Sequence, residues 1–157
     1  MKVVVPVQDA KCADTLGAFI RNYPWPTDME FQVAHIVQPV LVNSFMSLLP
    51  APLTLSIIEE RTREGEVIVK RLSDTIKEAF PSARVSEVLI EGDAKSEIVS
   101  LLEESDADLV VLGSHVKTAM QGSVSRAVVA HSPCSAMVIP IEQREPKKTK
   151  DKLHIIV

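Results

Sequence analysis

The amino-acid sequence predicts a three-layer, doubly wound α/β domain built on a five-stranded parallel sheet. Short β-branched segments alternate along the chain with segments of helical periodicity. The connections between successive strands hold about a dozen residues or more, which is the length that joins parallel strands, and right-handed crossovers place helices on both faces of the sheet. The length of 157 residues and the hydrophobic content of 46% are those of one globular domain.

The first half of the chain predicts two strands and two helices. Lys2–Val7 is a β-branched run suited to a strand buried on both faces. Ala10–Asn22 has apolar residues at helical spacing and ends before two prolines, and Met29–Val37 is the second strand. A long helix follows from about Leu53 to Phe80, where Pro81 ends it. The stripe of this helix that we expect to be buried consists of Ile57, the stem of Arg61, Ile68, Leu72, Ile76 and Phe80.

The second half predicts three further strands and two further helices. The strands are Arg84–Ile90, Asp108–Leu112 and Ser135–Pro140, and the helices are Ala94–Glu104 and Ser123–Ala130. Asp93 stands where an acidic side chain caps the first of these helices. The segment Gly113–Gly122 is predicted to be a loop, because it begins and ends with glycine.

Two segments lie outside this alternation. Pro39–Ile58 is apolar, but Pro50 and Pro52 interrupt it, so it predicts a loop entering a helix and not a membrane span of ~20 residues. Packing over the domain and a lid or subunit contact remain alternative roles for it. At the end of the chain, residues 143–157 form a tail after the domain of residues 1–142. We expect its last part, Leu153–Val157, to dock as a strand on a sheet edge of its own or a partner subunit.

The composition argues against several classes of partner. The formal net charge of -4 gives no basic surface for nucleic acid or an anionic membrane. Cys12 and Cys134 are far apart and have no further partner at metal-ligand spacing, so neither a disulfide framework nor a metal site is expected. The apolar run before Pro6 is too short for a signal peptide. We therefore expect a soluble, cytoplasmic protein that binds neither nucleic acid nor membranes.

Candidate site residues follow the predicted strands. In open parallel sheets, ligands bind outside the carboxyl ends of the strands, where the strand order reverses. Gln8–Ala10, Ala34–Val37 and Gly113–Ser125 are predicted to lie there. The last of these joins glycines, which allow close backbone approach, to a helix N-terminus, which attracts phosphate. Alternatively, Gly113 only ends a strand and Ser123 only caps a helix. The glycine signatures of P-loop and dinucleotide-binding folds are absent from the sequence.

Three stretches in the second half resemble the universal stress protein family. Ala107–His115 is similar to the family's penultimate strand and glycine loop, Gly122–Ser125 to its Gly-Ser-Val-Ser helix start, and His131–Pro140 to its last strand. The resemblance implies a sheet of the adenine-nucleotide α-hydrolase-like type and, in most members, a homodimer. It also implies ATP binding in some members and none in others.

The sequence departs from the pattern of the ATP-binding members at three points. Val116 stands at the second glycine, and only the short segment Lys117–Gln121 separates it from Gly122. Gln8 stands at the nucleotide-contacting aspartate, with Asp9 displaced by one residue, although a slip of one residue would restore the match. An amide binds a ribose diol less well than a carboxylate does, and a shorter loop offers fewer N–H groups, so all three changes weaken ATP binding. Lys117 partly offsets them as a cation.

Isolated histidines and cysteines carry little functional signal. His115 lies in the predicted loop with no orienting partner evident from the sequence, so we expect no acid–base role for it. His35 and His131 are predicted to be structural. Cys134 is predicted to be a buried small apolar residue, and no supporting base is evident beside Cys12.

The sequence therefore predicts a non-catalytic stress-response protein that acts as a homodimer and has a weak or vestigial nucleotide cleft. The candidate nucleotide-binding residues are Val7, Gln8, Asp9, Ala34, Gly113, Ser114, His115, Lys117, Gly122, Ser123, Val124 and Ser125. No cofactor is required, and ATP or AMP would bind weakly. The alternative is an ATP or AMP sensor that uses the shortened loop. An ATP hydrolase is the least favoured alternative. Hydrolysis needs a positioned water, a metal ligand and a group that stabilises charge, and only Asp9, Lys117 and His115 are candidates for these roles.

Overall fold

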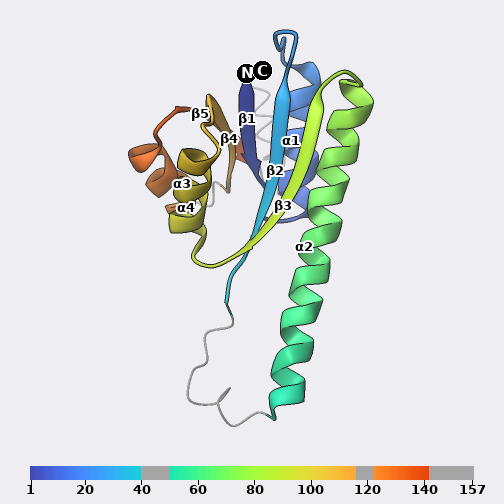
Figure 1. Cartoon of the computed structure of the whole chain (residues 1–157), viewed down its shortest axis with the longest axis vertical. Helices are drawn as coiled ribbons and strands as arrows, with labels where there is room; N and C mark the ends of the chain where they lie inside the picture. Colours follow the sequence, from blue (N-terminus) through green and yellow to red (C-terminus); the bar gives the residue numbers. More distant parts are fainter. Residues whose placement is uncertain (40–49, 116–121, 142–157) are drawn as a thin grey trace, which may run out of the picture.

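Five parallel strands form one sheet in the order β3-β2-β1-β4-β5 (Figure 1). The computed structural model describes residues 1–39, 50–115 and 122–141. The strands are β1 Lys2–Pro6, β2 Glu30–Val37, β3 Arg84–Glu91, β4 Leu109–His115 and β5 Ser135–Ile141, and the helices are α1 Ala10–Asn22, α2 Ala51–Ala79, α3 Ala94–Glu104 and α4 Ser123–His131. The predicted doubly wound parallel sheet is confirmed.

Two helices cover each face of the sheet. In Figure 1, α1 and α2 lie on one side of the strands and α3 and α4 on the other. Alternate residues of β1 enter the two layers: Val3 and Val5 pack with α1 and α2, and Val4 packs with α3 and α4. All three side chains are fully buried, as predicted from the β-branched run.

The strand order reverses between β1 and β4. From β1 the chain winds outward through β2 to β3, and it then crosses back to place β4 on the other side of β1 and β5 at the edge. The loops that leave β1 and β4 therefore run in opposite directions. Such a switch point leaves a crevice at the carboxyl ends of the two strands.

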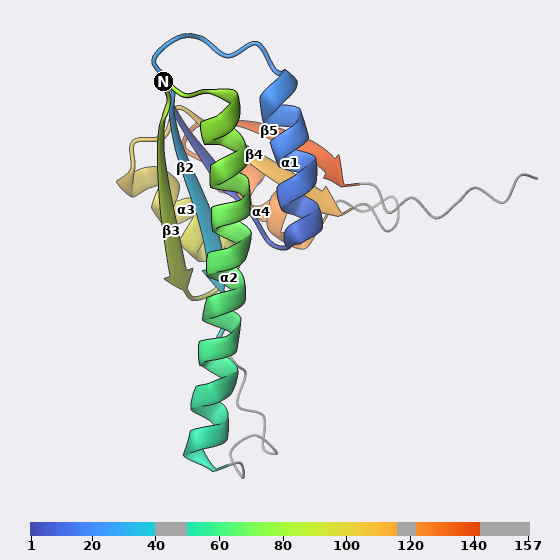
Figure 2. The ribbon, with the colours of Figure 1, turned by 90° about the vertical axis from the view of Figure 1, so that its right-hand side faces the viewer.

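Helix α2 extends well beyond the sheet (Figure 2). Its buried residues are confined to the later part of the helix and are Gly65, Val69, Leu72, Ser73 and Ile76. Of the predicted stripe, Leu72 and Ile76 are buried, whereas Ile57, Ile68 and Phe80 are half-buried and Arg61 is exposed. Leu53 and Leu55 are 51% and 60% exposed. The predicted stripe was too long because the strands do not run alongside the first turns of α2.

Strand β4 is longer than predicted. Gly113, Ser114 and His115 were expected to begin a loop, but they pair in register with Ile139, Pro140 and Ile141 of β5. The continuous apolar run ends at Leu112, so the local pattern contained no signal for this extension. The hydrogen-bond ladder with a neighbouring parallel strand decides it instead.

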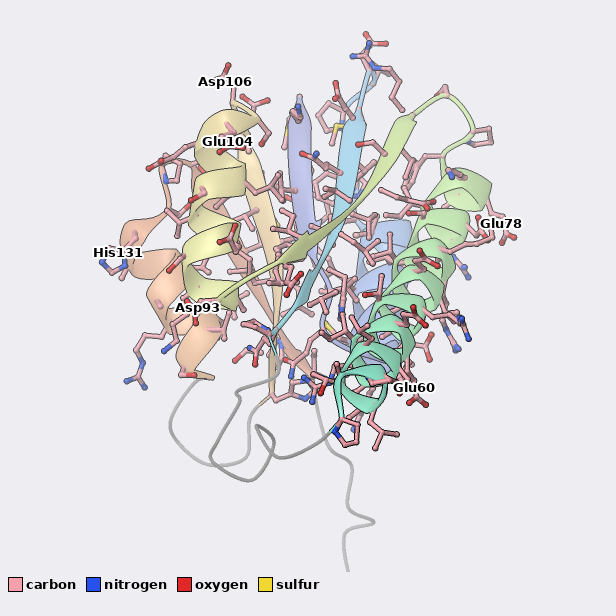
Figure 3. All side chains as sticks on the ribbon, turned by 60° about the horizontal axis from the view of Figure 1, so that its bottom comes forward. Glu60, Glu78, Asp93, Glu104, Asp106 and His131 are labelled. Atoms are coloured by element: carbon pink, nitrogen blue, oxygen red, sulfur yellow. The ribbon has the colours of Figure 1, made fainter. Side chains whose placement is uncertain are left out.

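The histidines predicted to be structural differ in their surroundings. His35 lies between the sheet and α2, and its Nδ1 is 2.8 Å from the carbonyl oxygen of Val7. His131 is exposed, and it points away from the sheet at the end of α4 (Figure 3), where Nδ1 lies 2.9 Å from the carbonyl oxygen of Ala127. The predicted structural role therefore fits His35, which packs between two elements, better than it fits the exposed His131.

Two predicted segments lie outside the described residues. They are the apolar loop over residues 40–49 and the tail over residues 143–157. Within the described ranges, no helix combines the length and the apolar character needed to cross a membrane.

Candidate functional site

A cavity of about 390 Å³ opens at the carboxyl ends of β1, β2 and β4. It lies at the switch point of the strand order, where ligands bind in folds of this class, and its volume is that of a small-molecule site. Most of the predicted site residues line it, namely Val7, Gln8, Asp9, Ala34, Gly113, Val124 and Ser125.

The remaining predicted residues that the structure describes do not line the cavity. Ser114 is buried, and His115 ends β4 next to Asp9. Gly122 and Ser123 form the start of α4 but do not line the cavity. Lys117 lies outside the described residues.

The Asp9 carboxylate contacts two neighbouring groups at once. Its Oδ1 accepts a hydrogen bond of 2.8 Å from the backbone N–H of Cys12, which makes it the N-cap of α1. Its Oδ2 lies 3.1 Å from Nε2 of His115. Gln8 is exposed on the same cavity wall. A ligand hydroxyl that approached Asp9 would therefore compete with both of these contacts.

His115 has the partner that the sequence did not reveal. The ring stands beside the Asp9 carboxylate, but the N–H direction does not satisfy hydrogen-bond geometry, so the contact is an ion pair when the ring is protonated. The His115 side chain is 24% exposed and that of Asp9 is 43% exposed. The expectation of an unpartnered loop histidine was wrong, because β4 continues to His115 and brings the ring alongside the end of β1.

The start of α4 is held by three hydroxyl contacts. Ser114 Oγ accepts a hydrogen bond of 3.3 Å from the backbone N–H of Gly122. Ser125 Oγ lies 3.2 Å from Ser114 Oγ and 3.0 Å from the carbonyl oxygen of Gly122. Both serines therefore serve the helix start.

Helix α4 differs from α1 and α3 in how its first N–H groups are capped. Its N-cap is Gly122 and not Ser123, and no side chain of the described residues caps it. The first N–H groups of any helix have no acceptor within the helix. Asp9 and Asp93 cap α1 and α3, which confirms the prediction for Asp93. Within the part of the chain that the structure describes, α4 is thus the one of the three helices beginning beside this cavity whose first N–H groups have no side-chain cap and can serve an anion.

Gly113 is needed for packing. A Cβ atom at this position would overlap Cδ1 of Ile141 and lie 2.7 Å from Sγ of Cys12. The glycine therefore allows α1 and β5 to pack closely against β4. This packing requires a glycine at position 113 whether or not a ligand binds in the cavity.

Most of the wall on the side of α1 and α2 was not predicted, although His35 belongs to the predicted segment Ala34–Val37. Cys12, His35, Gln38, Arg61 and Glu64 line the cavity there. Nη1 of Arg61 is 3.4 Å from the carbonyl oxygen of Gln38. Arg61 and Ile68 both belong to the predicted inner stripe of α2 and both line the cavity, so that stripe was the signal that could have indicated this wall.

Cys12 is a buried thiol in the first turn of α1. It is 2% exposed, and burial raises the pKa of this thiol to about 11. A group with a raised pKa stabilises the fold below its unfolded value, and this contribution is lost as the pH rises toward the folded value. For Cys12 the window runs from about pH 9 to about pH 11.

Removing this thiol should change the alkaline stability. Relative to a Cys12→Ala variant, the parent protein should lose about 1 kcal/mol of unfolding free energy between pH 8 and pH 10. Urea unfolding of both proteins at the two pH values measures this difference, and titration of the other groups cancels in the comparison. A difference that did not depend on pH would contradict the assignment of the shift to Cys12.

Comparisons with known proteins agree on one family. The model of the universal stress protein family matches residues 2–140. A universal stress protein of Methanocaldococcus jannaschii is 26% identical over 152 residues, which cover 94% of this chain and 84% of that protein.

Two solved structures have the same fold. The universal stress protein UspA of Lactobacillus plantarum has a TM-score of 0.68 at 17% identity, covering 88% of this chain and 97% of its own. A family protein of Arabidopsis thaliana with AMP bound has a TM-score of 0.64 at 15% identity, covering 95% of this chain and 97% of its own. At such low identity the two likenesses show the fold.

Proposed function

The chain belongs to the universal stress protein family, and we propose that it is a non-catalytic stress-response protein that acts as a homodimer and binds nucleotides weakly in its cleft. The observation that carries the nucleotide part is the cavity at the switch point, with the first turn of α4, at Val124 and Ser125, on one side and the Asp9 carboxylate on the other. Phosphate fits the first group and a ribose diol fits the second. The solved Arabidopsis thaliana relative has AMP bound, which supports a ligand of this class.

Three features make the binding weak. Asp9 already holds the N–H of Cys12 and stands against His115, so a ribose would compete for its oxygens. The segment between Val116 and Gly122 is short, which leaves fewer N–H groups for a polyphosphate. Val116 places a side chain where the ATP-binding pattern has glycine.

Calorimetry with ATP should give a dissociation constant no tighter than about 100 μM, or ~5.5 kcal/mol of binding free energy. Replacing Gly122 by tryptophan should abolish the binding, because the ring would cover the start of α4. Gly122→Ala is the matched control: its Cβ would be no closer than 3.5 Å to any neighbouring atom, so fold and binding should persist. Low-micromolar affinity would mean that the short loop is an effective cradle, and the proposal of weak binding would then be wrong.

An ATP or AMP sensor is the second candidate, and the open cavity lined by most of the predicted residues favours it. Protein purified without added nucleotide separates the two functions. Adenine nucleotide detected by mass spectrometry in that preparation would favour the sensor. A preparation free of nucleotide, together with a weak dissociation constant, would favour the first proposal.

Strand β5 supports the homodimer. It lies at an edge of the sheet, and Met137, Val138 and Ile139 are only half-buried there. An apolar edge strand that keeps open hydrogen-bonding groups pairs readily with another copy of itself.

Light scattering should therefore give about twice the chain mass of 17.2 kDa at micromolar concentration. A Val138→Lys substitution should shift the protein to a monomer, because it puts a charge on the proposed interface. Val129→Lys is the control, since Val129 is 47% exposed and belongs to α4, not to the edge strand. A monomer mass for the parent protein would rule out the homodimer.

A further inference from the structure

His115, at the end of β4, is the histidine of the described residues that stands against a carboxylate. Its Nε2 lies 3.1 Å from Oδ2 of Asp9. This nitrogen is shielded from solvent and makes no aligned hydrogen bond to any described residue. Two acceptors repel each other at such a distance, so Nε2 carries a proton, and the carboxylate is the group that stabilises it.

The other oxygen of Asp9 belongs to the fold. Oδ1 accepts the hydrogen bond from the backbone N–H of Cys12 and caps α1. The Asp9 side chain is 43% exposed and lines the cavity, so a ligand can reach it. A vicinal diol donates one hydrogen bond to each oxygen of a carboxylate, and it therefore needs Oδ2 as well. Oδ2 is the atom for which the imidazole and a ribose diol compete.

The charge of the imidazole sets the strength of this competition. Imidazoles gain and lose a proton between about pH 5 and pH 8. A protonated ring at position 115 forms an ion pair with the carboxylate, whereas a neutral ring leaves the weaker contact of an N–H dipole. A diol that takes Oδ2 therefore displaces a weaker partner at higher pH.

Among the described groups near this ring, the Asp9 carboxylate is the one in ion-pair contact with it. Strand β5 brings the apolar Ile141, its partner in register, and α1 brings the buried thiol of Cys12 to the same end of β4. Arg126 in the first turn of α4 is exposed, so solvent screens its charge. Arg61 and Glu64 of α2 line the cavity with opposite charges.

We propose that His115 regulates this cleft, because its protonated ring occupies Oδ2 of Asp9 and its neutral ring yields that oxygen to a ribose diol. The proposal rests on the proposed nucleotide function, since it places the ribose at Asp9. The empty cleft holds a proton that the occupied cleft releases, so the contribution of the diol to binding rises with pH. Acidification would then favour the empty cleft.

Paired titrations with AMP and 2′,3′-dideoxy-AMP test this role, because the two ligands differ only in the ribose hydroxyls. Titration of the phosphate is common to both and cancels in the ratio of their dissociation constants. At about pH 8 the parent protein should bind AMP about fivefold more tightly than the dideoxy ligand, and at about pH 5.5 the two should agree within about twofold. Calorimetry at both pH values measures the ratio.

His115→Gln should hold the ratio near the higher value at both pH values, because an amide keeps an N–H donor but does not gain a charge. His131→Gln is the matched control, since His131 is exposed and points away from the sheet (Figure 3). Its ratio should change with pH as that of the parent protein does. Circular dichroism and melting curves of both variants check the fold, and His115→Asn repeats the test with a shorter amide.

The outcomes separate this inference from the function on which it depends. If the ratio for the parent protein were the same at both pH values, or if the amide variants kept its pH dependence, His115 would not regulate the site and the nucleotide cleft would stand. If neither ligand bound to any of these proteins at millimolar concentration, both proposals would fail.

Discussion

Replacing Gly113 by alanine should destabilise the fold by about 2–3 kcal/mol, which corresponds to a melting temperature lower by roughly 5–10 °C. The added methyl group would overlap Cδ1 of Ile141 and lie 2.7 Å from Sγ of Cys12. Both neighbours are buried, and each belongs to an element that packs against β4, so neither can move away without opening the core. Thermal and urea unfolding of the purified variant measure the loss.

Two further variants show whether this overlap is the cause. Gly122→Ala should change the stability little, since the nearest atom to its Cβ would be at 3.5 Å. Adding Cys12→Ala and Ile141→Val to Gly113→Ala should recover part of the loss, relative to the same two substitutions alone, because they remove the atoms that the methyl group meets. If Gly113→Ala melted like the parent protein, the packing account of this glycine would be wrong.

Replacing Gly65 by alanine should also destabilise the protein, by about 2 kcal/mol. In the interior of an isolated helix the same change is favourable by about 1 kcal/mol. A loss of stability would therefore show that neighbouring side chains leave no room for the added methyl group. A Cβ at position 65 would lie 2.6 Å from Cδ2 of His35 and 3.2 Å from Cδ2 of Leu89. The imidazole would have to move, and its contact of 2.8 Å with the carbonyl oxygen of Val7 would be lost.

A double-mutant cycle isolates this contact. In a His35→Ala background the ring is absent, and Gly65→Ala should then be neutral or stabilising. The coupling between the two sites, measured by urea unfolding of the four proteins, should be about 2 kcal/mol or more. Equal costs of Gly65→Ala in both backgrounds would show that the space beside Gly65 does not depend on His35.

The local signals in the sequence were sufficient for most of the fold. Helix α1 has the predicted bounds Ala10–Asn22 and α3 has the predicted bounds Ala94–Glu104, with Asp93 as its cap. These limits depend on neighbouring residues, namely capping side chains, prolines and apolar spacing. The parallel order of the sheet followed from the length of the crossovers, because parallel neighbours need a connection of about a dozen residues or more and every connection here has that length.

The chemistry of the candidate site depended more on tertiary structure. The sequence located the cavity through the carboxyl ends of its strands, and most of the predicted residues line it. It could not pair His115 with Asp9, because the two residues meet only when β4 lies beside β1. Nor could it explain Gly113 or Gly65, whose close neighbours come from other elements. Periodicity and capping report on residues a few positions apart, whereas contacts between elements exist only after the sheet has assembled. For that reason the tertiary structure alone decided which residues from different elements meet at the cleft.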